Sequence, residues 1–344
     1  MAQRPDDPQP PFDLAGLLAA DGRADEAAKL FDQAAEIDPR RAERVASEKA
    51  RYRDAYQDQA QEQFDAGNLE EASRRLDQAD AMEPAHVRTE LLRGKIAWDE
   101  RRIAEAAEHF RHPYAQDHSS EALTGLCDAL SAQGREAYQA AKYARAWDLL
   151  TEAQEIESRP DLHLFLGTVA YSWAQTLPVE DRRPHLEDAR AAFERALRAH
   201  PEDDDARFNL ATSLLAIGDY AGAADLYKKM VARDPENGNF YMALARAHSL
   251  SGDSGIATTE EAIGRALTVG EPVHDPPSWA SRSADRFARS HLAGAYREAM
   301  APQAIRTYSL PGGGLVEVWF YWDRGVIEAF REGARLGPAF TLDR

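Results

Sequence analysis

Residues 204–237, DDARFNLATSLLAIGDYAGAADLYKKMVARDPEN, contain the pattern that decides the fold. The dipeptides Leu-Ala at 210–211 and Gly-Asp at 218–219 recur 34 residues later, at 244–245 and 252–253. A period of this length predicts one supersecondary unit that is stacked many times, because a compact single core has no reason to repeat.

The residues before position 204 follow the same 34-residue period. Four of them align with residues 34 positions later: Ala189 with Ala223, Phe193 with Tyr227, Ala196 with Met230 and Pro201 with Pro235.

Each unit has the pattern of two helices. In residues 204–237, Asp203 is a typical N-cap, and Phe208 and Leu214 belong to one apolar helical face. Gly218 marks the end of the first helix and Pro235 the end of the second. Such a hairpin leaves an apolar face open, so several must stack to be stable.

These residues resemble the tetratricopeptide repeat family, whose units are 34 residues long. The resemblance implies a mainly α fold, an α-α superhelix of about seven helix-turn-helix units with a small C-terminal α+β cap. After a disordered stretch at 1–7, the array is expected over 8–272, with approximate units at 8–41, 53–86, 87–120, 127–160, 160–203, 204–237 and 238–272.

Two units depart from the regular pattern. Residues 40–66 contain no Pro or Gly, which predicts an unusually long helix at the start of the second unit. The fifth unit has about ten extra residues around 175–184, which predicts a first helix extended past Trp173 and a loop near 178–184.

The C-terminal region, 273–344, has different residue types. Ser278 is expected to cap a helix over 279–300, followed by a small antiparallel meander with strands at 305–310, 315–322 and 326–330. Residues 340–342 are a candidate fourth strand, and a helix over 326–336 is the competing interpretation. Residues 317–321 resemble the end of a GWxTD-type β module of exported bacterial proteins, which implies an envelope location.

Composition limits the partners. The 344 residues include 59 acidic and 41 basic side chains, a formal net charge of −18, which argues against nucleic acid as a partner. No apolar run reaches the roughly 18 residues that span a bilayer, so no membrane insertion is expected. The single cysteine, Cys127, lies in an apolar helical context and is expected in the core. A cytoplasmic location is expected, or a periplasmic one if a signal segment has been removed.

No catalytic, metal-binding or cofactor-binding constellation is found in the sequence. His109 and His112 could share a helix face, but Pro113 is expected to end that helix. Gly312-Gly313-Gly314 has the pattern of a hairpin turn. Acidic pairs such as Glu260-Glu261 are expected at helix starts. An enzyme is therefore not expected; the candidates for a site would be His274, Asp275, Asp285 and His291.

Family resemblance places certain first-helix positions along a concave groove. Several residues at those positions are aromatic or positively charged, and such residues suit a peptide-binding surface. The candidate groove residues are Lys95, Trp98, Arg135, Tyr138, Thr168, Tyr171, Phe208, Thr212, Leu215, Met242 and Arg246. Packing between repeats is the alternative role for the aromatic ones.

The function expected from this pattern is a non-enzymatic scaffold that binds a peptide or protein segment. The alternative is a structural or assembly protein of the bacterial envelope, in which the strand containing Trp319 and Trp322 pairs with another chain. A monomer is the favoured oligomeric state.

Overall fold

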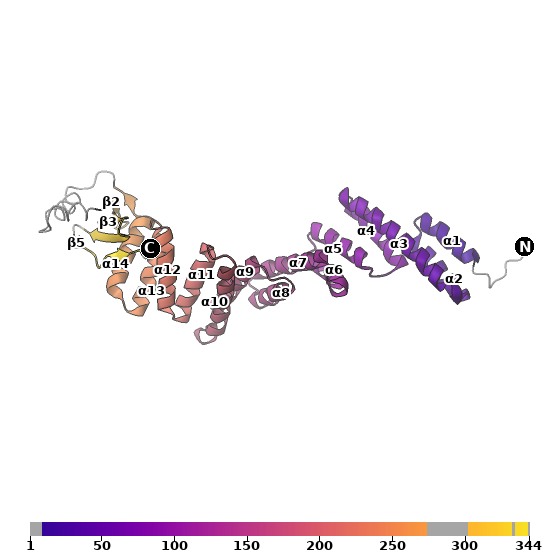
Figure 1. Cartoon of the computed structure of the whole chain (residues 1–344), viewed down its shortest axis with the longest axis horizontal. Helices are drawn as coiled ribbons and strands as arrows, with labels where there is room; N and C mark the ends of the chain where they lie inside the picture. The colour runs from indigo at the N-terminus through magenta and orange to yellow at the C-terminus, as the bar shows by residue number, and fades with distance from the viewer. Residues whose placement is uncertain (1–8, 274–301, 332–333, 343–344) are drawn as a thin grey trace, which may run out of the picture. The chain divides into compact units, whose positions relative to one another are not determined.

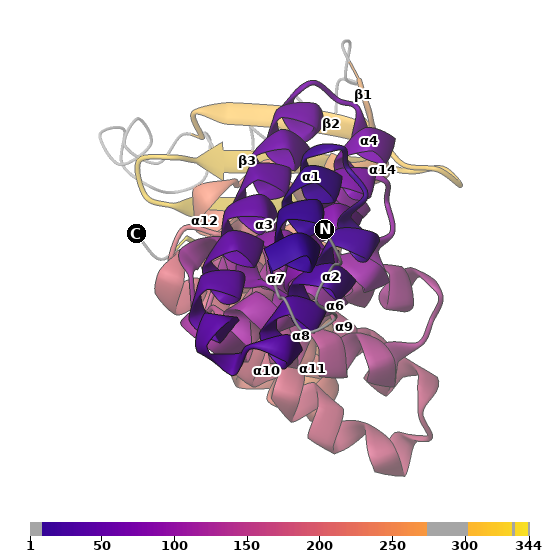
Figure 2. The same ribbon diagram turned by 90° about the vertical axis from the view of Figure 1, so that its right-hand side faces the viewer.

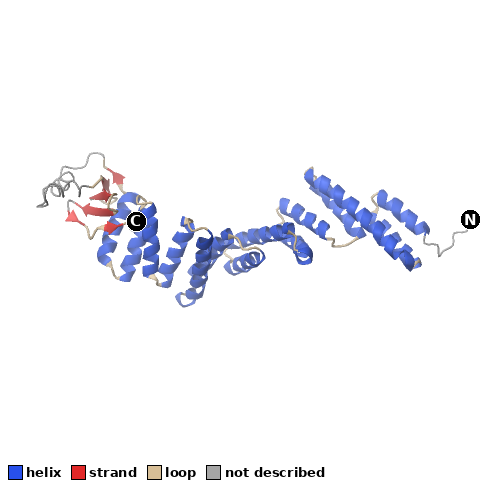
Figure 3. Ribbon diagram, in the orientation of Figure 1, coloured by secondary structure: helices blue, strands red, loops and turns tan. Residues whose placement is uncertain are grey.

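The structure is a computed structural model that describes residues 9–273, 302–331 and 334–342. The chain forms two compact units, which we call unit 1 (Met1–Leu162) and unit 2 (His163–Arg344). Fourteen α-helices lie in the described residues, and all of them precede the six described strands. Figures 1 and 3 show the helices followed by the strands toward the C-terminus. The predicted mainly α repeat architecture is confirmed.

Unit 1 is built from helix hairpins in which neighbours in sequence contact one another. Its helices are α1 (Gln9–Ala20), α2 (Ala24–Ile37), α3 (Ala42–Asp65), α4 (Leu69–Met82), α5 (Val87–Asp99), α6 (Ile103–Asp117), α7 (Ser120–Gln139) and α8 (Tyr143–Ile156). A 3₁₀ helix, η1 (Pro39–Arg41), precedes α3. The 24 residues of α3 are the long helix that the sequence predicts.

The helices of unit 2 continue the same pattern. They are α9 (Pro160–Thr176), which begins at the boundary with unit 1, then α10 (Arg182–Ala199), α11 (Asp204–Ile217), α12 (Tyr220–Arg233), α13 (Gly238–Ser251) and α14 (Ser254–Val269). Helix α9 extends past Trp173, as predicted. The predicted loop after it is shorter, because the 3₁₀ helix η2 (Val179–Asp181) leads directly into α10 and Pro184 lies in the first turn of α10.

Two predicted boundaries around residue 120 are wrong. Helix α6 continues through Pro113 to Asp117, because a proline removes one hydrogen bond while the neighbouring turns and the contact with α7 remain. Helix α7 begins at Ser120, seven residues before the predicted start of the fourth unit at 127, because the Ser119 hydroxyl accepts a hydrogen bond from the Ala122 amide at 3.2 Å.

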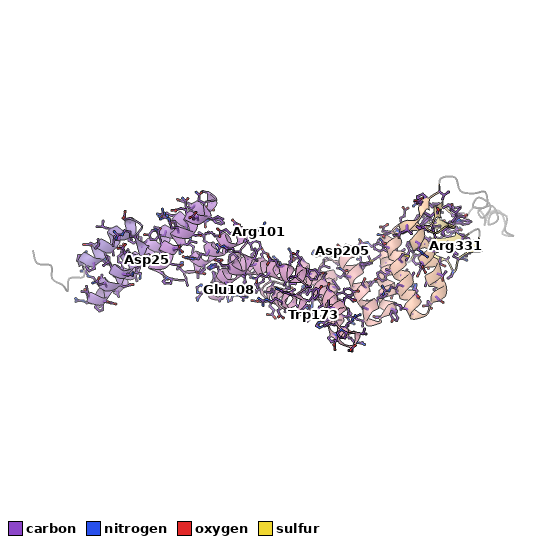
Figure 4. The ribbon with its side chains drawn as sticks, turned by 180° about the vertical axis from the view of Figure 1, so that it is seen from behind. Asp25, Arg101, Glu108, Trp173, Asp205 and Arg331 are labelled. Atoms are coloured by element: carbon purple, nitrogen blue, oxygen red, sulfur yellow. The ribbon has the colours of Figure 1, made fainter. Side chains whose placement is uncertain are left out.

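The hairpin turns require a left-handed residue. Gly218 and Gly252 both have φ of +97°, a conformation that glycine adopts without steric cost. In the α5–α6 and α7–α8 turns this place is taken by Arg101 (φ +62°) and Ala141 (φ +56°), and Figure 4 labels Arg101 at its turn. Since a Cβ disfavours this region, these two turns of unit 1 are strained.

Close helix packing in unit 1 depends on two other glycines. A Cβ on Gly94 of α5 would lie 2.7 Å from the ring of Phe110, and one on Gly125 of α7 would lie 2.8 Å from the same ring. Phe110 of α6 is therefore held between the helices of two successive hairpins. Cys127 is also fully buried, as predicted, and burial raises the pKa of its thiol.

A six-stranded antiparallel sheet follows the last hairpin. Its strands are β1 (Glu271–Pro272), β2 (Ala304–Ser309), β3 (Leu315–Tyr321), β4 (Val326–Arg331), β5 (Ala334–Arg335) and β6 (Phe340–Thr341). Figure 2 shows β2 and β3 side by side, and α14 contacts β2, β3, β4 and β6. The sheet therefore covers the end of the repeat array.

The strand predictions over 305–330 and 340–341 are confirmed, and the competing helix over 326–336 is wrong. Strand β1 was not predicted, because Pro272 was interpreted only as a break. The predicted glycine turn joins β2 and β3 with φ near +90° at Gly312, Gly313 and Gly314. The helix expected over 279–300 and the candidates His274, Asp275, Asp285 and His291 lie outside the described residues.

Strand β3 lies between β2 and β4, so both edges of its backbone are paired within the sheet and this strand is not a free edge. The alternative of an envelope protein that acts through the C-terminal β segment stays a prediction. In the described part of the chain, no helix is both long and apolar enough to cross a membrane.

Candidate peptide-binding hollows

Unit 2 contains a hollow of about 430 Å³ that helices of three successive hairpins line together. Tyr171 of α9, Thr212 and Leu215 of α11 and Arg246 of α13 all border it. All four belong to the candidate groove residues that the family resemblance implies. In a stacked array, equivalent positions of successive hairpins form one continuous surface, and this hollow lies on it.

The connection between α9 and α10 completes this hollow. Val179 comes from η2, and Arg182, Arg183 and Leu186 come from α10. The hollow therefore has three arginines, and we call it the arginine hollow; none of the described Asp and Glu residues lines it. Burial raises the pKa of the Tyr171 hydroxyl, which keeps this tyrosine neutral.

The arginines of this hollow have few partners inside the protein. Arg182 donates from Nε to the Leu177 carbonyl at 2.9 Å. Arg183 lies 3.9 Å from a Glu187 carboxylate oxygen, and its side chain is 73% exposed. Among the described residues, Arg246 makes no hydrogen bond or ion pair, so its charge is available to a ligand.

A second hollow of about 440 Å³ adjoins the arginine hollow, since both include Arg246 and Leu250. Met242 and Ser249 of α13 border it, together with Ala257 and Glu261 of α14. Met242 also packs close to Gly264, so this candidate residue is partly structural.

Unit 1 has two hollows that share Trp98 and Asp128, and we call them the tryptophan hollows. The larger, about 410 Å³, has aromatic walls formed by Phe64, Trp98 and Phe110. The smaller, about 350 Å³, continues toward Arg135 and the start of α9.

The cations of the tryptophan hollows are paired with carboxylates. Lys95 forms an ion pair with Glu121, and Arg159 pairs with Asp128 at 2.7 Å. Arg135 lies 3.9 Å from Asp161. Each positive charge has a negative neighbour, and Asp99 adds a further carboxylate to the larger hollow, so these hollows present aromatic surface without an excess of positive charge.

Three candidate residues border none of these hollows. Phe208 packs against Tyr227 and Phe240, with ring centroids 5.8 and 6.5 Å away, and so joins successive hairpins. Tyr138 packs on Tyr143 at 5.7 Å. The Thr168 hydroxyl donates to the Leu164 carbonyl of its own helix at 3.0 Å. For these residues the packing role accounts for the pattern.

Three residues of the arginine hollow are not among the predicted groove residues: Val179, Arg182 and Arg183. The signal for them in the sequence is the insertion of about ten residues around 175–184. The prediction that Glu260 lies at a helix start is wrong, because Glu260 is fully buried within α14, with a carboxylate oxygen 2.8 Å from His248 Nδ1. His109, one of the pair examined for metal binding, instead contacts the Glu90 carboxylate at 2.8 Å.

The family profile described as "Tetratricopeptide repeat" matches residues 58–117 and 182–238. The chain contains tetratricopeptide repeats. The two matched segments include α4–α6 and α10–α12, the helices that carry Trp98, Arg182 and Leu215. Proteins of this family are generally non-enzymatic scaffolds, and the fold supports an interaction with other proteins.

Several solved structures match the chain at low identity and with TM-scores below 0.5. YrrB, titled "a TPR protein with an unusual peptide-binding site", is 16% identical with a TM-score of 0.40, covering 56% of this chain and 92% of YrrB. MamA AMB-1 is 17% identical with a TM-score of 0.38, covering 50% and 85%. A tetratricopeptide repeat protein from Parabacteroides merdae is 14% identical with a TM-score of 0.35, covering 72% and 90%. Likeness at this level says nothing of what the present chain binds.

Proposed function

We propose that this chain is a scaffold that binds a segment of a partner protein in the hollows of its repeats. The observation that carries the proposal is the arginine hollow, where Tyr171, Thr212, Leu215 and Arg246 meet from three hairpins. Tyrosine and arginine are among the residue types that contribute most to binding at protein interfaces.

The size and the arrangement of the hollows suit side chains of a peptide. Each holds about 350–440 Å³, toward the lower end of the range of concave ligand sites. Because the hollows of each unit adjoin in pairs, an extended segment can place successive side chains in them. The paired hollows share Trp98 in unit 1 and Arg246 in unit 2.

Selection of random twelve-residue peptides displayed on phage, with the intact chain as bait, tests this proposal. We expect peptides whose affinity falls at least about tenfold for Tyr171→Ala, since an aromatic anchor contributes more than about 1.4 kcal/mol. If every selected peptide bound Tyr171→Ala as tightly as the native chain, the assignment of Tyr171 to the binding surface would be contradicted.

Trp173→Ala is the matched control. Trp173 lies on the same helix, labelled in Figure 4, and stacks on His185 at 4.0 Å without bordering the hollow. Its replacement also removes a large aromatic ring from α9, so it reports any general weakening of the helix. We expect peptide binding to be retained by this variant.

A further inference from the structure

We propose that the arginine hollow selects an acidic segment, in which two or more carboxylates flank an apolar side chain. This inference rests on the proposed function and specifies the chemistry of the segment that unit 2 recognises. The residues that carry it include Arg182 and Arg183, which come from the insertion after α9 and not from the regular repeat positions.

The charge of the hollow contrasts with that of the whole chain. The protein has a formal net charge of −18, so its field repels acidic peptides in general. Against that field, three arginines border one hollow, and no carboxylate from the part of the chain that the structure describes borders it. A guanidinium group offers a planar set of donors that matches a carboxylate in a two-point contact. Acidic side chains are the ligands that this set of groups favours.

The internal contacts of these arginines leave donors available. Arg246 has no hydrogen-bond or ion-pair partner among the described residues, and Arg182 uses Nε on a backbone carbonyl. The one carboxylate near Arg183, that of Glu187, lies at 3.9 Å, which is too long for a hydrogen bond. A ligand carboxylate would therefore not have to displace a strong internal partner.

The walls of the hollow explain why the ligand is a peptide segment and not a small anion. Leu215, Ile217 and Leu250 border the hollow, and Val179 stands beside them with 75% of its surface exposed. An apolar side chain between two acidic ones would bury this surface, which free phosphate cannot do. The shape and charge together fit an acidic stretch that is interrupted by Leu, Ile or Phe.

The same phage-displayed peptide library tests this inference on the intact chain. We expect the selected peptides that depend on Tyr171 to be enriched in Asp and Glu. Their affinity should fall about tenfold or more in Arg182→Gln/Arg183→Gln, and it should fall with rising salt, because exposed ion pairs are screened. Arg195→Gln/Arg198→Gln is the matched control, since both residues are exposed on the same helix outside the hollow.

Arg246→Gln keeps the inference testable if the double variant does not fold. Arg246 makes no hydrogen bond or ion pair with a described residue, so its replacement removes charge without removing such a contact. We expect about tenfold weaker binding of the acidic peptides, with an unchanged circular dichroism spectrum and melting temperature.

The outcomes distinguish this inference from the proposed function. Selected peptides without acidic enrichment, or bound equally by the arginine variants, would overturn the inference and leave the scaffold function in place. Failure to select any peptide would overturn both. Displacement of the acidic peptides by inorganic phosphate at equal concentration would show a site for small anions and would overturn the assignment to a peptide.

Discussion

The hollows of the two units use equivalent repeat positions but differ in chemistry. In unit 1, Trp98 stands among aromatic walls, and Lys95 is neutralised by Glu121. In unit 2, Tyr171 stands beside Arg246, which has no such partner in the described residues. The repeat places these residues at equivalent positions, whereas the residues around those positions set the charge of each hollow.

The difference arises outside the repeated positions. In unit 1, the carboxylates that pair with the cations of the tryptophan hollows are Glu121 and Asp128, and both lie on α7. In unit 2, the additional cations are Arg182 and Arg183, which come from the insertion and begin α10. We therefore expect unit 1 to bind apolar or aromatic side chains and unit 2 to bind acidic ones. The predictions below test this difference, beginning with the largest effect.

Gly94→Val should break the hollow of unit 1 and leave that of unit 2 intact. The ring of Phe110 borders this hollow, and a Cβ added to Gly94 would lie 2.7 Å from that ring. We expect a loss of about 3 kcal/mol in the free energy of unfolding, because overpacking forces the ring or the helix to move. Urea denaturation measures this loss. Unaltered stability would contradict the contact of Phe110 with Gly94.

Phe208→Ala should separate packing from binding within unit 2. The ring joins α11 to Tyr227 and Phe240 but does not border the arginine hollow. We expect a loss of about 2 kcal/mol in stability, less than for a fully buried Phe because this ring is half-buried. Peptides that depend on Tyr171 should still bind below the melting temperature. Loss of binding without loss of stability would place Phe208 in the binding surface instead.

Ala141→Gly should stabilise unit 1, and Gly218→Ala should destabilise unit 2. Both residues have positive φ at the turn of a hairpin, +56° and +97°, and only the alanine carries a Cβ there. We expect changes of about 1 kcal/mol in opposite directions. Thermal unfolding of the two variants checks the signs, and equal signs would contradict the account of the turns.

Two carboxyl groups should give the units opposite responses to pH. The hydrogen bond with His109 lowers the pKa of Glu90 in unit 1, so its stabilising contribution is present above pH 4.5 and is lost as pH falls through the folded pKa. Burial raises the pKa of Glu317 in β3, so its contribution is complete below pH 4.5 and is lost as pH rises through the folded pKa.

The contribution of each group is measured as the slope of the free energy of unfolding against pH. Glu90→Gln should reduce the loss of stability on acidification. Glu317→Gln should reduce the loss on going from acid to neutral pH, while its side-chain oxygen can still accept from Trp319 Nε1, which lies 3.0 Å from the native carboxylate. The two substitutions should change the slope in opposite directions. Changes of the same sign would contradict either the pairing of Glu90 or the burial of Glu317.

The sequence predicted the repeat fold because its signal is periodic and local. Residues such as Gly218 and Asp203 carry their conformational role in their own chemistry, and the Asp203 carboxylate does cap α11 by accepting from the Ala206 amide at 2.9 Å. The central strand β3 was likewise readable from an apolar run on both faces.

The sequence could not predict which groove positions stay open. Tyr171 and Phe208 are both aromatic residues at positions expected to face the groove, yet one borders a hollow and the other packs between hairpins. That outcome depends on what neighbouring helices place opposite each ring. Helix α6 also showed that tertiary contacts can carry a helix through Pro113, which local rules predict as an end.

Hydrogen–deuterium exchange of the intact chain, with and without a selected peptide that depends on Tyr171, tests the central claim most directly. The account predicts that the peptide slows exchange in α9, α11 and α13 around Tyr171, Thr212 and Arg246, and at the start of α10. Protection confined to α12 and to the strands β2–β4, with none in α9, α11 or α13, would contradict it.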